Sequence, residues 1–362
     1  MHRRTHTKVG RTSKIGRQRI ARCNAPGGVV LEETKGTAKG AGTAGVATGF
    51  WCETQWFRDA DEHAEALRRW DQRYEQLSSG RFEGRISQTW LEGIQIFHET
   101  TREVVDQAGS AWPGAVTVGL VRASSDSASF VARSVAPGDG FIFGSPGEFC
   151  LRTARRFEVI GLSVPASMLN AFAQKSGDFQ GRSWDSLQPA QLSRSEPLKV
   201  LHSLCGTYFD VVSQDRQAFS QQAARSSVRD QLLAALTDLR DAQTVDEPAS
   251  GQRRKLVKEV ERLVRERCSS PVTALELCQT LRVSRRTLQY SFQQELGVSP
   301  LQYLRAIRLN GVRRELKFSF PGARVWEVAA RWGFWHQGQF ARDYRAMFGE
   351  LPSQTLRSGG PR

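Results

Sequence analysis

The sequence predicts an α+β protein of several domains. A small antiparallel β-barrel or sandwich with accompanying helices comes first, followed by an all-α domain with two helix-turn-helix units. Three observations point to this: short apolar runs between turn residues in the first half, capped amphipathic helices in the last hundred residues, and uneven charge along the 362 residues. A chain of this length usually forms two or three domains.

Positive charge is concentrated at the two ends of the chain. The net formal charge is +8 over residues 1–50, −6 over residues 51–250 and +12 over residues 251–362. A basic module beside an acidic one indicates a polyanionic partner, nucleic acid first, although a solvated basic surface has the same composition. The charge pattern therefore favours a nucleic-acid partner without establishing one.

Other features of the sequence bear on the compartment. No apolar run approaches the roughly eighteen residues of a membrane span, and the basic opening lacks the apolar core of a secretory signal. The six cysteines are scattered singly, which is typical of reduced thiols. We expect a cytoplasmic protein that does not contact a membrane.

The first 241 residues divide into an extension and a sensor domain. Residues 1–48 have almost no apolar periodicity and predict a disordered basic extension, either inert or weakly attracted to phosphates. Residues 49–241 are expected to form a sensor and dimerisation domain. Ala66, Trp70, Tyr74 and Leu77 have the spacing of a helix over residues 59–77. The expected strands lie in the runs 85–97, 115–121, 130–135, 140–143, 148–151 and 157–164.

Two or three helices are expected after the strands. One begins after Pro165 and covers residues 168–175. Two apolar stripes follow, and they either pack on the barrel or form a dimer interface. Residues 242–252 read as a linker. The stripes consist of Leu198, Leu201, Leu204, Tyr208 and Val211, and of Val228, Leu232, Leu236 and Leu239.

The first helix-turn-helix unit is predicted over residues 272–297, within an all-α domain at 253–357. Thr273 and Glu276 fit a capping box, and Leu275, Cys278 and Leu281 are the expected buried stripe. After a break at residues 282–284 a second helix begins, with Leu288 and Phe292 on its buried side. Its outward residues suit base reading, because Arg pairs with guanine and Gln with adenine. They are Arg286 and Tyr290, with Gln289 on the flank and Arg285 placed to hold a phosphate.

A connector and a second unit, at residues 323–349, complete the predicted domain. Gly297 ends the preceding helix, and Ser299 and Pro300 begin a connector that runs to Lys317. Val325, Val328, Ala329 and Trp332 are the expected stripe of the next helix. A recognition-type helix follows over residues 336–348, with Phe340, Tyr344, Met347 and Phe348 pointing inward and Gln339 and Arg342 outward.

The C-terminal domain resembles the DNA-binding domain of the AraC/XylS family of bacterial transcription regulators. The resemblance implies that both units insert into successive major-groove segments. It places base contacts on Arg286, Gln289 and Tyr290, next to Ser284 and Arg285, and on His336, Gln337, Gln339 and Arg342. Three residues depart from the family pattern: Gly338 within the second recognition helix, the bulky Trp335, and Thr355. The second unit is therefore expected to contribute more to positioning the domain on DNA than to reading bases. The motifs that carry the resemblance are residues 283–289, 292–300, 328–334 and 340–352.

Residues 54–165 more weakly resemble the cupin-like sensor halves of one branch of this family, near regulators of ethanolamine use. The segments 57–63 and 80–84 carry this likeness, which implies a small-molecule effector. Only His63 and His98 lie in or near the barrel, without metal-ligand spacing, so we expect no metal and no cofactor. The candidate pocket residues, each of which ordinary core or surface packing explains more readily, are Trp90, Phe97, Trp112, Phe143 and Glu99, the last as partner for an amine.

Three functions are compared. The first is a sequence-specific transcription regulator that is a homodimer and binds promoter DNA, an effector and RNA polymerase, as an activator or a repressor. The second is an enzyme of the kind that joins similar helix-turn-helix units to a zinc-cysteine methyl acceptor in DNA-alkylation repair. Cys23, Cys52 and Cys150 are too sparse for the four-cysteine cluster that this needs. The third is a structural nucleoid binder, which outward-facing Arg and Gln side chains argue against. The first function is expected, with an activator as the working assumption and no enzymatic activity.

Overall fold

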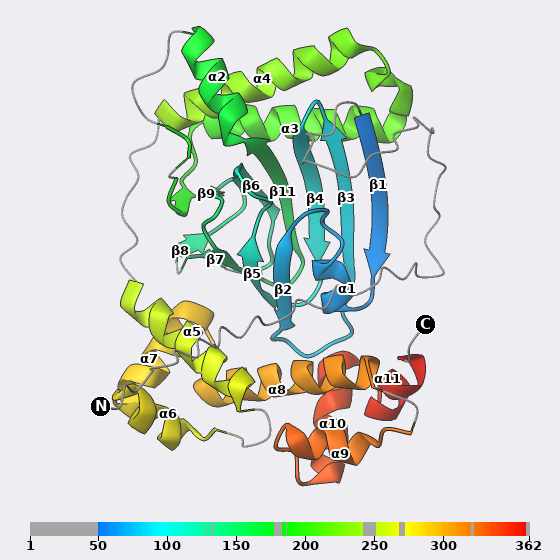
Figure 1. Cartoon of the computed structure of the whole chain (residues 1–362), viewed down its shortest axis with the longest axis vertical. Coiled ribbons are helices and arrows are strands. Elements are labelled where there is room, and N and C mark those ends of the chain that lie inside the picture. Colours follow the sequence, from blue (N-terminus) through cyan, green and yellow to red (C-terminus); the bar gives the residue numbers. More distant parts are fainter. Residues whose placement is uncertain are drawn as a thin grey trace, which may run out of the picture. The chain divides into compact units, whose positions relative to one another are not determined.

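In the computed structural model, the described residues of the N-terminal domain form two antiparallel sheets and four α-helices (Figure 1). The predicted extension at residues 1–48 and most of the predicted linker, residues 242–250, lie outside the described residues. The structure describes residues 50–126, 128–131, 133–176, 183–185, 187–241, 251–267, 272–319 and 322–359.

Twelve strands of the described residues form the two sheets. They are β1 (Phe50–Phe57), β2 (Asp71–Gln76), β3 (Gly84–Leu91), β4 (Ile94–Thr101), β5 (Val105–Ser110), β6 (Ala115–Ala123), β7 (Ala128–Phe130), β8 (Arg133–Val135), β9 (Gly140–Gly144), β10 (Phe149–Arg152), β11 (Phe157–Pro165) and β12 (Ala190–Leu192). One sheet has the order β1-β3-β4-β11-β6-β9-β12 and the other β2-β5-β10-β7-β8. Each sheet therefore keeps two edge strands, and the pairing does not close the strands into the predicted barrel.

The larger sheet is buried on both faces. On one face, Trp90 and Phe143 share an aromatic core with Phe149 of the smaller sheet. On the other face, Ile96 and Leu162 pack against helices. Burial on both sides explains why these strands are nearly continuous apolar runs rather than strictly alternating ones.

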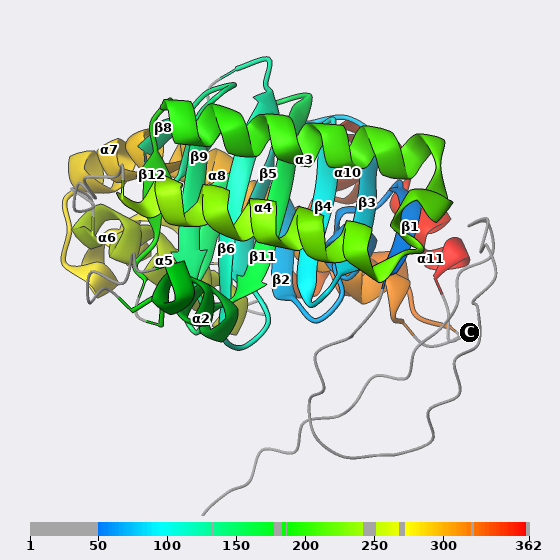
Figure 2. The ribbon, with the colours of Figure 1, turned by 90° about the horizontal axis from the view of Figure 1, so that it is seen from above.

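Helices α3 (Glu196–Gln214) and α4 (Gln222–Asp241) lie side by side across the outer face of the larger sheet (Figures 1 and 2). The predicted apolar stripes of both helices face this sheet, with Leu201 and Leu236 at 0% and 1% exposure. The packing interpretation of the stripes is therefore confirmed. Helix α2 (Ala166–Ser176) begins directly after β11, close to where it was expected.

The helix predicted over residues 59–77 is wrong. Only α1 (Ala60–Ala64) is helical there, and β2 follows after a turn in which Arg69 has a φ of 71°. The spacing of Trp70 and Tyr74 has another cause, because both reach between the sheets, where Trp70 donates to Gln95 and Tyr74 to Glu99. The expected single run at 85–97 is two strands joined by a tight turn, and β1, β5 and β12 were not predicted.

The C-terminal domain contains the two helix-turn-helix units joined by α8. Its helices are α5 (Gly251–Glu266), α6 (Ala274–Leu281), α7 (Arg285–Leu296), α8 (Pro300–Lys317), α9 (Val325–Arg331), α10 (Gln337–Phe348) and α11 (Pro352–Ser358). Leu304 of α8 belongs to the core of the first unit and Leu309 to that of the second, so α8 is shared by both. In the described part of the chain, no helix is both long and apolar enough to cross a membrane.

Local capping explains where these helices begin and end. The Thr273–Glu276 capping box, the Ser299–Gln302 capping box and Gly297 at a φ of 59° are all as predicted. One residue of the predicted stripe of α6 is wrong: Leu275 is 68% exposed, and Leu277, at 0%, fills the core instead. The other two predicted residues, Cys278 and Leu281, do pack against that core.

Candidate nucleic-acid interface

Helix α7 exposes the side chains predicted to meet DNA. Arg285, Arg286 and Gln289 are exposed and Tyr290 is 52% exposed, whereas Leu288 on the opposite side is buried. The predicted inner and outer faces of this helix are thus confirmed, while the contacts themselves remain predictions. The positive end of the helix dipole lies beside these residues, which favours a nearby phosphate.

Two details of α7 were not read from the sequence. The hydroxyl of Ser284 accepts from the backbone N–H of Thr287 at 3.0 Å, so this predicted contact residue serves as the N-cap of the helix. Arg253 of α5 lies over the Tyr290 ring, with its guanidinium carbon 5.1 Å from the ring centroid. Arg253 adds positive charge at the exposed face of α7, and the basic outer face of α5 was the available signal.

Helix α10 also exposes its predicted residues. His336 is the N-cap, and Gln337, Gln339 and Arg342 are exposed. Gly338 is not in the middle of the helix, as had been expected, but is its second residue with open space around it. The first turn therefore tolerates a glycine that would weaken a helix interior.

The other two departures from the family pattern also have structural explanations. Trp335 is 66% exposed and precedes α10, so its bulk does not disturb the core. Thr355 is buried, where its hydroxyl donates to Glu350 at 2.6 Å and lies 2.8 Å from the Tyr344 hydroxyl. Its hydrogen bonds tie α11 to α10 in place of a larger ring.

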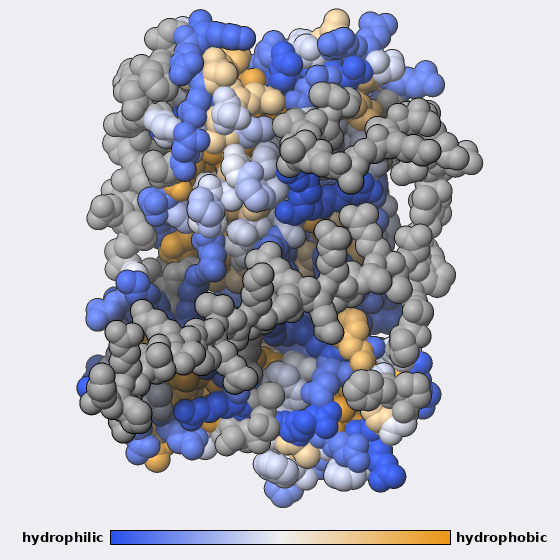
Figure 3. Space-filling view, in the orientation of Figure 1, coloured by the Kyte–Doolittle hydropathy of each residue, from blue (hydrophilic) through white to orange (hydrophobic). Residues whose placement is uncertain are grey.

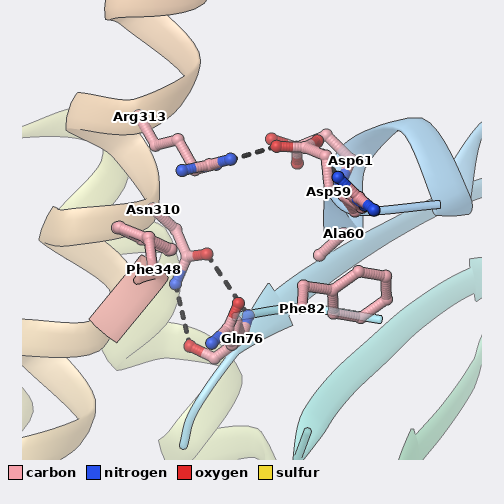
Figure 4. Close-up of a pocket in the computed structure, with 9 residues that line it drawn as sticks. Asp59, Ala60, Asp61, Gln76, Phe82, Asn310, Arg313 and Phe348 are labelled. Carbon is pink, nitrogen blue, oxygen red and sulfur yellow. Dashed lines mark hydrogen bonds and ion pairs between the residues drawn. The ribbon is translucent and has the colours of Figure 1, made fainter. Parts of the chain in front are cut away.

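The face of α8 that meets the N-terminal domain is rich in cations. The described residues of both domains belong to one compact unit. Arg313 pairs with Asp59 at 2.7 Å, as Figure 4 shows. Arg314 pairs with Asp61 at 2.6 Å and with Glu75 at 3.0 Å. Lys317 completes the set with Asp59 at 2.8 Å and Glu62 at 3.1 Å.

The electrostatics of this contact differ between its two aspartates: burial, only partly offset by Arg314, raises the pKa of Asp61 to about 6. Burial alone raises the pKa of Asp59, but Lys317 and Arg313 outweigh it and bring the pKa to about 2. Neutral hydrogen bonds lie beside the ion pairs (Figure 4): Asn310 Nδ2 donates to the Gln76 carbonyl at 2.9 Å, and the Gln76 N–H donates to Asn310 Oδ1 at 3.3 Å. The Asn310 side chain thus joins the domains through two hydrogen bonds to the Gln76 backbone, as a neighbouring strand would.

The loop after β2 also completes the end of α10. The Gly80 N–H donates to the carbonyls of Ala346 and Met347 at 3.1 and 3.2 Å. Gln76 Nε2 donates to the Met347 carbonyl at 2.8 Å. The last carbonyls of a helix have no partners within it, and here the N-terminal domain supplies them. Leu77 of the same segment packs against the cores of both helix-turn-helix units.

These contacts leave the predicted DNA-facing side chains exposed, because the N-terminal domain meets α8 and the far end of α10. Part of the positive charge of residues 251–362 therefore serves the domain contact. Where Figure 3 leaves the helical domain uncovered, most of the visible surface is hydrophilic, with apolar residues in small separate patches.

The candidate effector residues are all buried. Trp90 and Trp112 lie with ring centroids 5.8 Å apart, and Phe97 and Phe143 both contact Trp70, at 5.4 and 6.0 Å. A ligand would have to displace this packing to reach them. They do not line the groove of about 450 Å³ beside α8, whose walls include Arg73, Arg314 and Trp332.

Glu99, the remaining candidate, is also buried. It accepts hydrogen bonds from Tyr74 and Gln107, each at 2.9 Å, and lies 3.3 Å from Nε2 of the buried His63. Burial, opposed by these two hydrogen bonds, raises the pKa of Glu99 to about 7. Burial lowers the pKa of His63 to about 3. Burial therefore favours the uncharged form of both Glu99 and His63.

Comparison with known proteins concerns the C-terminal segment. Residues 277–358 match the family model described as a helix-turn-helix domain. The chain is 40% identical over 89 residues to the "Probable thc operon regulatory protein" of Rhodococcus erythropolis, a match that covers 24% of this chain and 27% of that protein. It is 37% identical over 101 residues to the "XylDLEGF operon transcriptional activator 1" of Pseudomonas putida, covering 27% of this chain and 30% of that protein. The C-terminal segment is a helix-turn-helix domain similar in sequence to part of each of these two proteins.

The match spans less than a third of these curated relatives. Among solved structures, a probable AraC family transcriptional regulator from Rhodopseudomonas palustris CGA009 is 34% identical, with a TM-score of 0.28, and aligns with 30% of this chain and 99% of that one. The AraC-like transcriptional activator CuxR is 18% identical with a TM-score of 0.40, covering 73% of this chain and 96% of that one. The identity to the two curated relatives is confined to the C-terminal segment.

Proposed function

We propose that this chain is a sequence-specific DNA-binding transcription regulator that responds to a small-molecule effector. The observation that carries the proposal is the pair of recognition helices, α7 and α10, which expose Arg and Gln side chains while their opposite faces are buried. Helix α8 joins the two units over 18 residues, about 27 Å at 1.5 Å per residue. This length approaches the ~34 Å of one turn of DNA, as two units on one face of a duplex require.

Base contacts are proposed for Arg286, Gln289 and Tyr290 in the first unit. In the second unit they are proposed for Gln337, Gln339 and Arg342, with His336 beside them. Arg285 and Arg253 would hold phosphates, which position the domain without reading sequence. Promoter DNA is then the main partner, with a homodimer and RNA polymerase as further proposed partners in the cytoplasm.

Arg286→Ala tests the base-reading role. Selection of binding sites from random duplex DNA should show relaxed preference at one base position, at a cost of about 1–3 kcal/mol. Lys199→Ala on α3 is a matched loss of one positive charge away from the recognition helices and should leave every position unchanged. Equal weakening on all sequences by Arg286→Ala would refute base reading by this residue.

The N-terminal domain is proposed as the sensor, in the cupin-like branch near ethanolamine-type regulators. The two segments that carry this likeness, residues 57–63 and 80–84, include Asp59, Asp61 and Gly80, which contact the helical domain. The segments that carry the likeness therefore also contact the helical domain, and an effector would act through this contact. The proposal does not name the effector. A thermal-shift screen of small amines and aromatic compounds tests the proposal, and a library without any stabilising compound would leave the domain a dimerisation module.

A further inference from the structure

The second recognition helix carries an acid on the side that would approach DNA. Asp343 lies one turn beyond Gln339 on α10, and its side chain is 15% exposed. It forms an ion pair with Arg305 of α8. A negative charge at a DNA-binding surface opposes phosphate binding. Attraction to DNA does not explain Asp343, whereas its contacts within the domain give it a role.

Asp343 and Arg342 together fix the amide of Gln339. Gln339 Nε2 donates to Oδ1 of Asp343 at 2.8 Å, and Nη2 of Arg342 donates to Gln339 Oε1 at 2.9 Å. An ionised carboxylate only accepts hydrogen bonds and a guanidinium only donates them. Both neighbours therefore demand the same orientation of the amide, and a flipped amide would lose both hydrogen bonds.

The atoms left over on Gln339 are those that recognise adenine. An amide has two N–H groups and two lone pairs on its oxygen, and each contact uses one. One donor and one acceptor remain side by side on an exposed side chain. Glutamine pairs with adenine through the same set, donating to N7 and accepting from the N6 amino group. Because the side chain is held before DNA arrives, less conformational entropy is lost on binding.

We propose that Asp343, anchored by Arg305, is a positioning residue that makes α10 read adenine through Gln339. This inference rests on the proposed function, in which α10 enters the major groove. The competing explanation of the same contacts is a structural tie between α8 and α10. The two differ in where base preference is lost, because a structural tie affects every position that the domain reads.

Site selection from random duplex DNA with the full-length chain provides the test. Gln339→Ala identifies the base position that Gln339 reads, where the wild type should prefer adenine. Asp343→Asn should lower that preference by about twofold, less than Gln339→Ala does, because an asparagine also donates and no longer rejects the flipped amide, while Arg342 still holds the Gln339 oxygen. Affinity for random duplex should stay equal or rise, since a negative charge is removed.

Two further variants separate positioning from folding and charge. Arg305→Gln keeps the carboxylate beside Gln339 and removes its anchor, so it should give a smaller loss at the same position. Asp230→Asn on α4 removes an exposed acid of the N-terminal domain and should leave every preference unchanged.

The possible outcomes are distinct. Unchanged adenine preference in Asp343→Asn, or another base at the Gln339 position, overturns the inference while base reading by α7 stands. Loss spread evenly over all positions in both Asp343→Asn and Arg305→Gln, including the position read by Arg286, also overturns it in favour of a structural tie. A wild-type profile that is flat at every position refutes the proposed function and this inference together.

Discussion

Arg314 offers the most direct test of the contact between the two domains. Its ion-pair partners, Asp61 and Glu75, and the Tyr74 carbonyl to which it donates at 2.7 Å, all belong to the N-terminal domain. Arg313, by contrast, also pairs with Glu350 inside the helical domain. Arg314→Ala therefore removes a contact between domains and leaves the ion pairs within the helical domain in place.

The expected cost follows from burial. Removing one partner of a fully buried ion pair costs about 3–5 kcal/mol, because the remaining charge is left uncompensated. The side chains of Arg314 and Asp61 are 18% and 22% exposed, and Glu75 keeps Arg73 at 2.7 Å. Water and Arg73 thus compensate part of the loss, so we expect about 2–3 kcal/mol.

Denaturant unfolding of the full-length chain, followed by fluorescence and circular dichroism, measures this cost. The wild type should unfold in one transition, whereas Arg314→Ala should unfold at lower denaturant and separate into two transitions as the domains uncouple. Arg262→Ala is the control, because Arg262 also pairs with two carboxylates, but on the exposed surface of α5. Such surface pairs contribute little. Equal effects of the two substitutions would refute the structural role assigned to the contact.

Two further predictions concern single buried sites. Because the folded chain keeps a proton on Glu99 up to a pKa of about 7, while the unfolded chain releases it near 4.5, the contribution of Glu99 to stability should fall between these pH values and level off above them, opposite to the contribution of His63, whose folded pKa is about 3. Glu99→Gln should remove this slope, a relative gain of up to about 3 kcal/mol from pH 4.5 to 8 in denaturant unfolding, and parallel pH profiles would contradict it. Gly297→Ala should cost about 1–2 kcal/mol, because the residue is left-handed and the new Cβ would lie 2.7 Å from a nitrogen of Arg152. In thermal unfolding, Gly297→Ala should destabilise the chain less in an Arg152→Ala background. An equal loss of stability in the two backgrounds would rule out a clash between the new Cβ and Arg152.

What the sequence predicted well are features specified by neighbouring residues. The capping box at Thr273, the Ser299–Pro300 start and the Gly297 end each need only a few residues, and the structure has all three. The outward faces of α7 and α10 followed from helical geometry for the same reason. Local signals therefore located the recognition helices, including the side chains that they expose.

What the sequence did not predict depends on segments distant along the chain. Trp70 and Tyr74 have helical spacing, yet their places are set by Gln95 and Glu99 on another strand. The pairing of Arg314 with Asp61 joins residues 253 positions apart. Opposite charges in the two halves were visible in the sequence, but were interpreted only as attraction for nucleic acid.

The loop that ends α10 has a consequence for domain exchange. A chimera that joined this helical domain to a foreign N-terminal domain would leave the carbonyls of Ala346 and Met347 without the Gly80 and Gln76 donors. The portable recognition module is therefore discontinuous, and includes residues 76–80 together with the C-terminal hundred. A graft that brings this short segment along should keep the second recognition helix intact to its last turn, where a cut at the linker alone would let that turn fray.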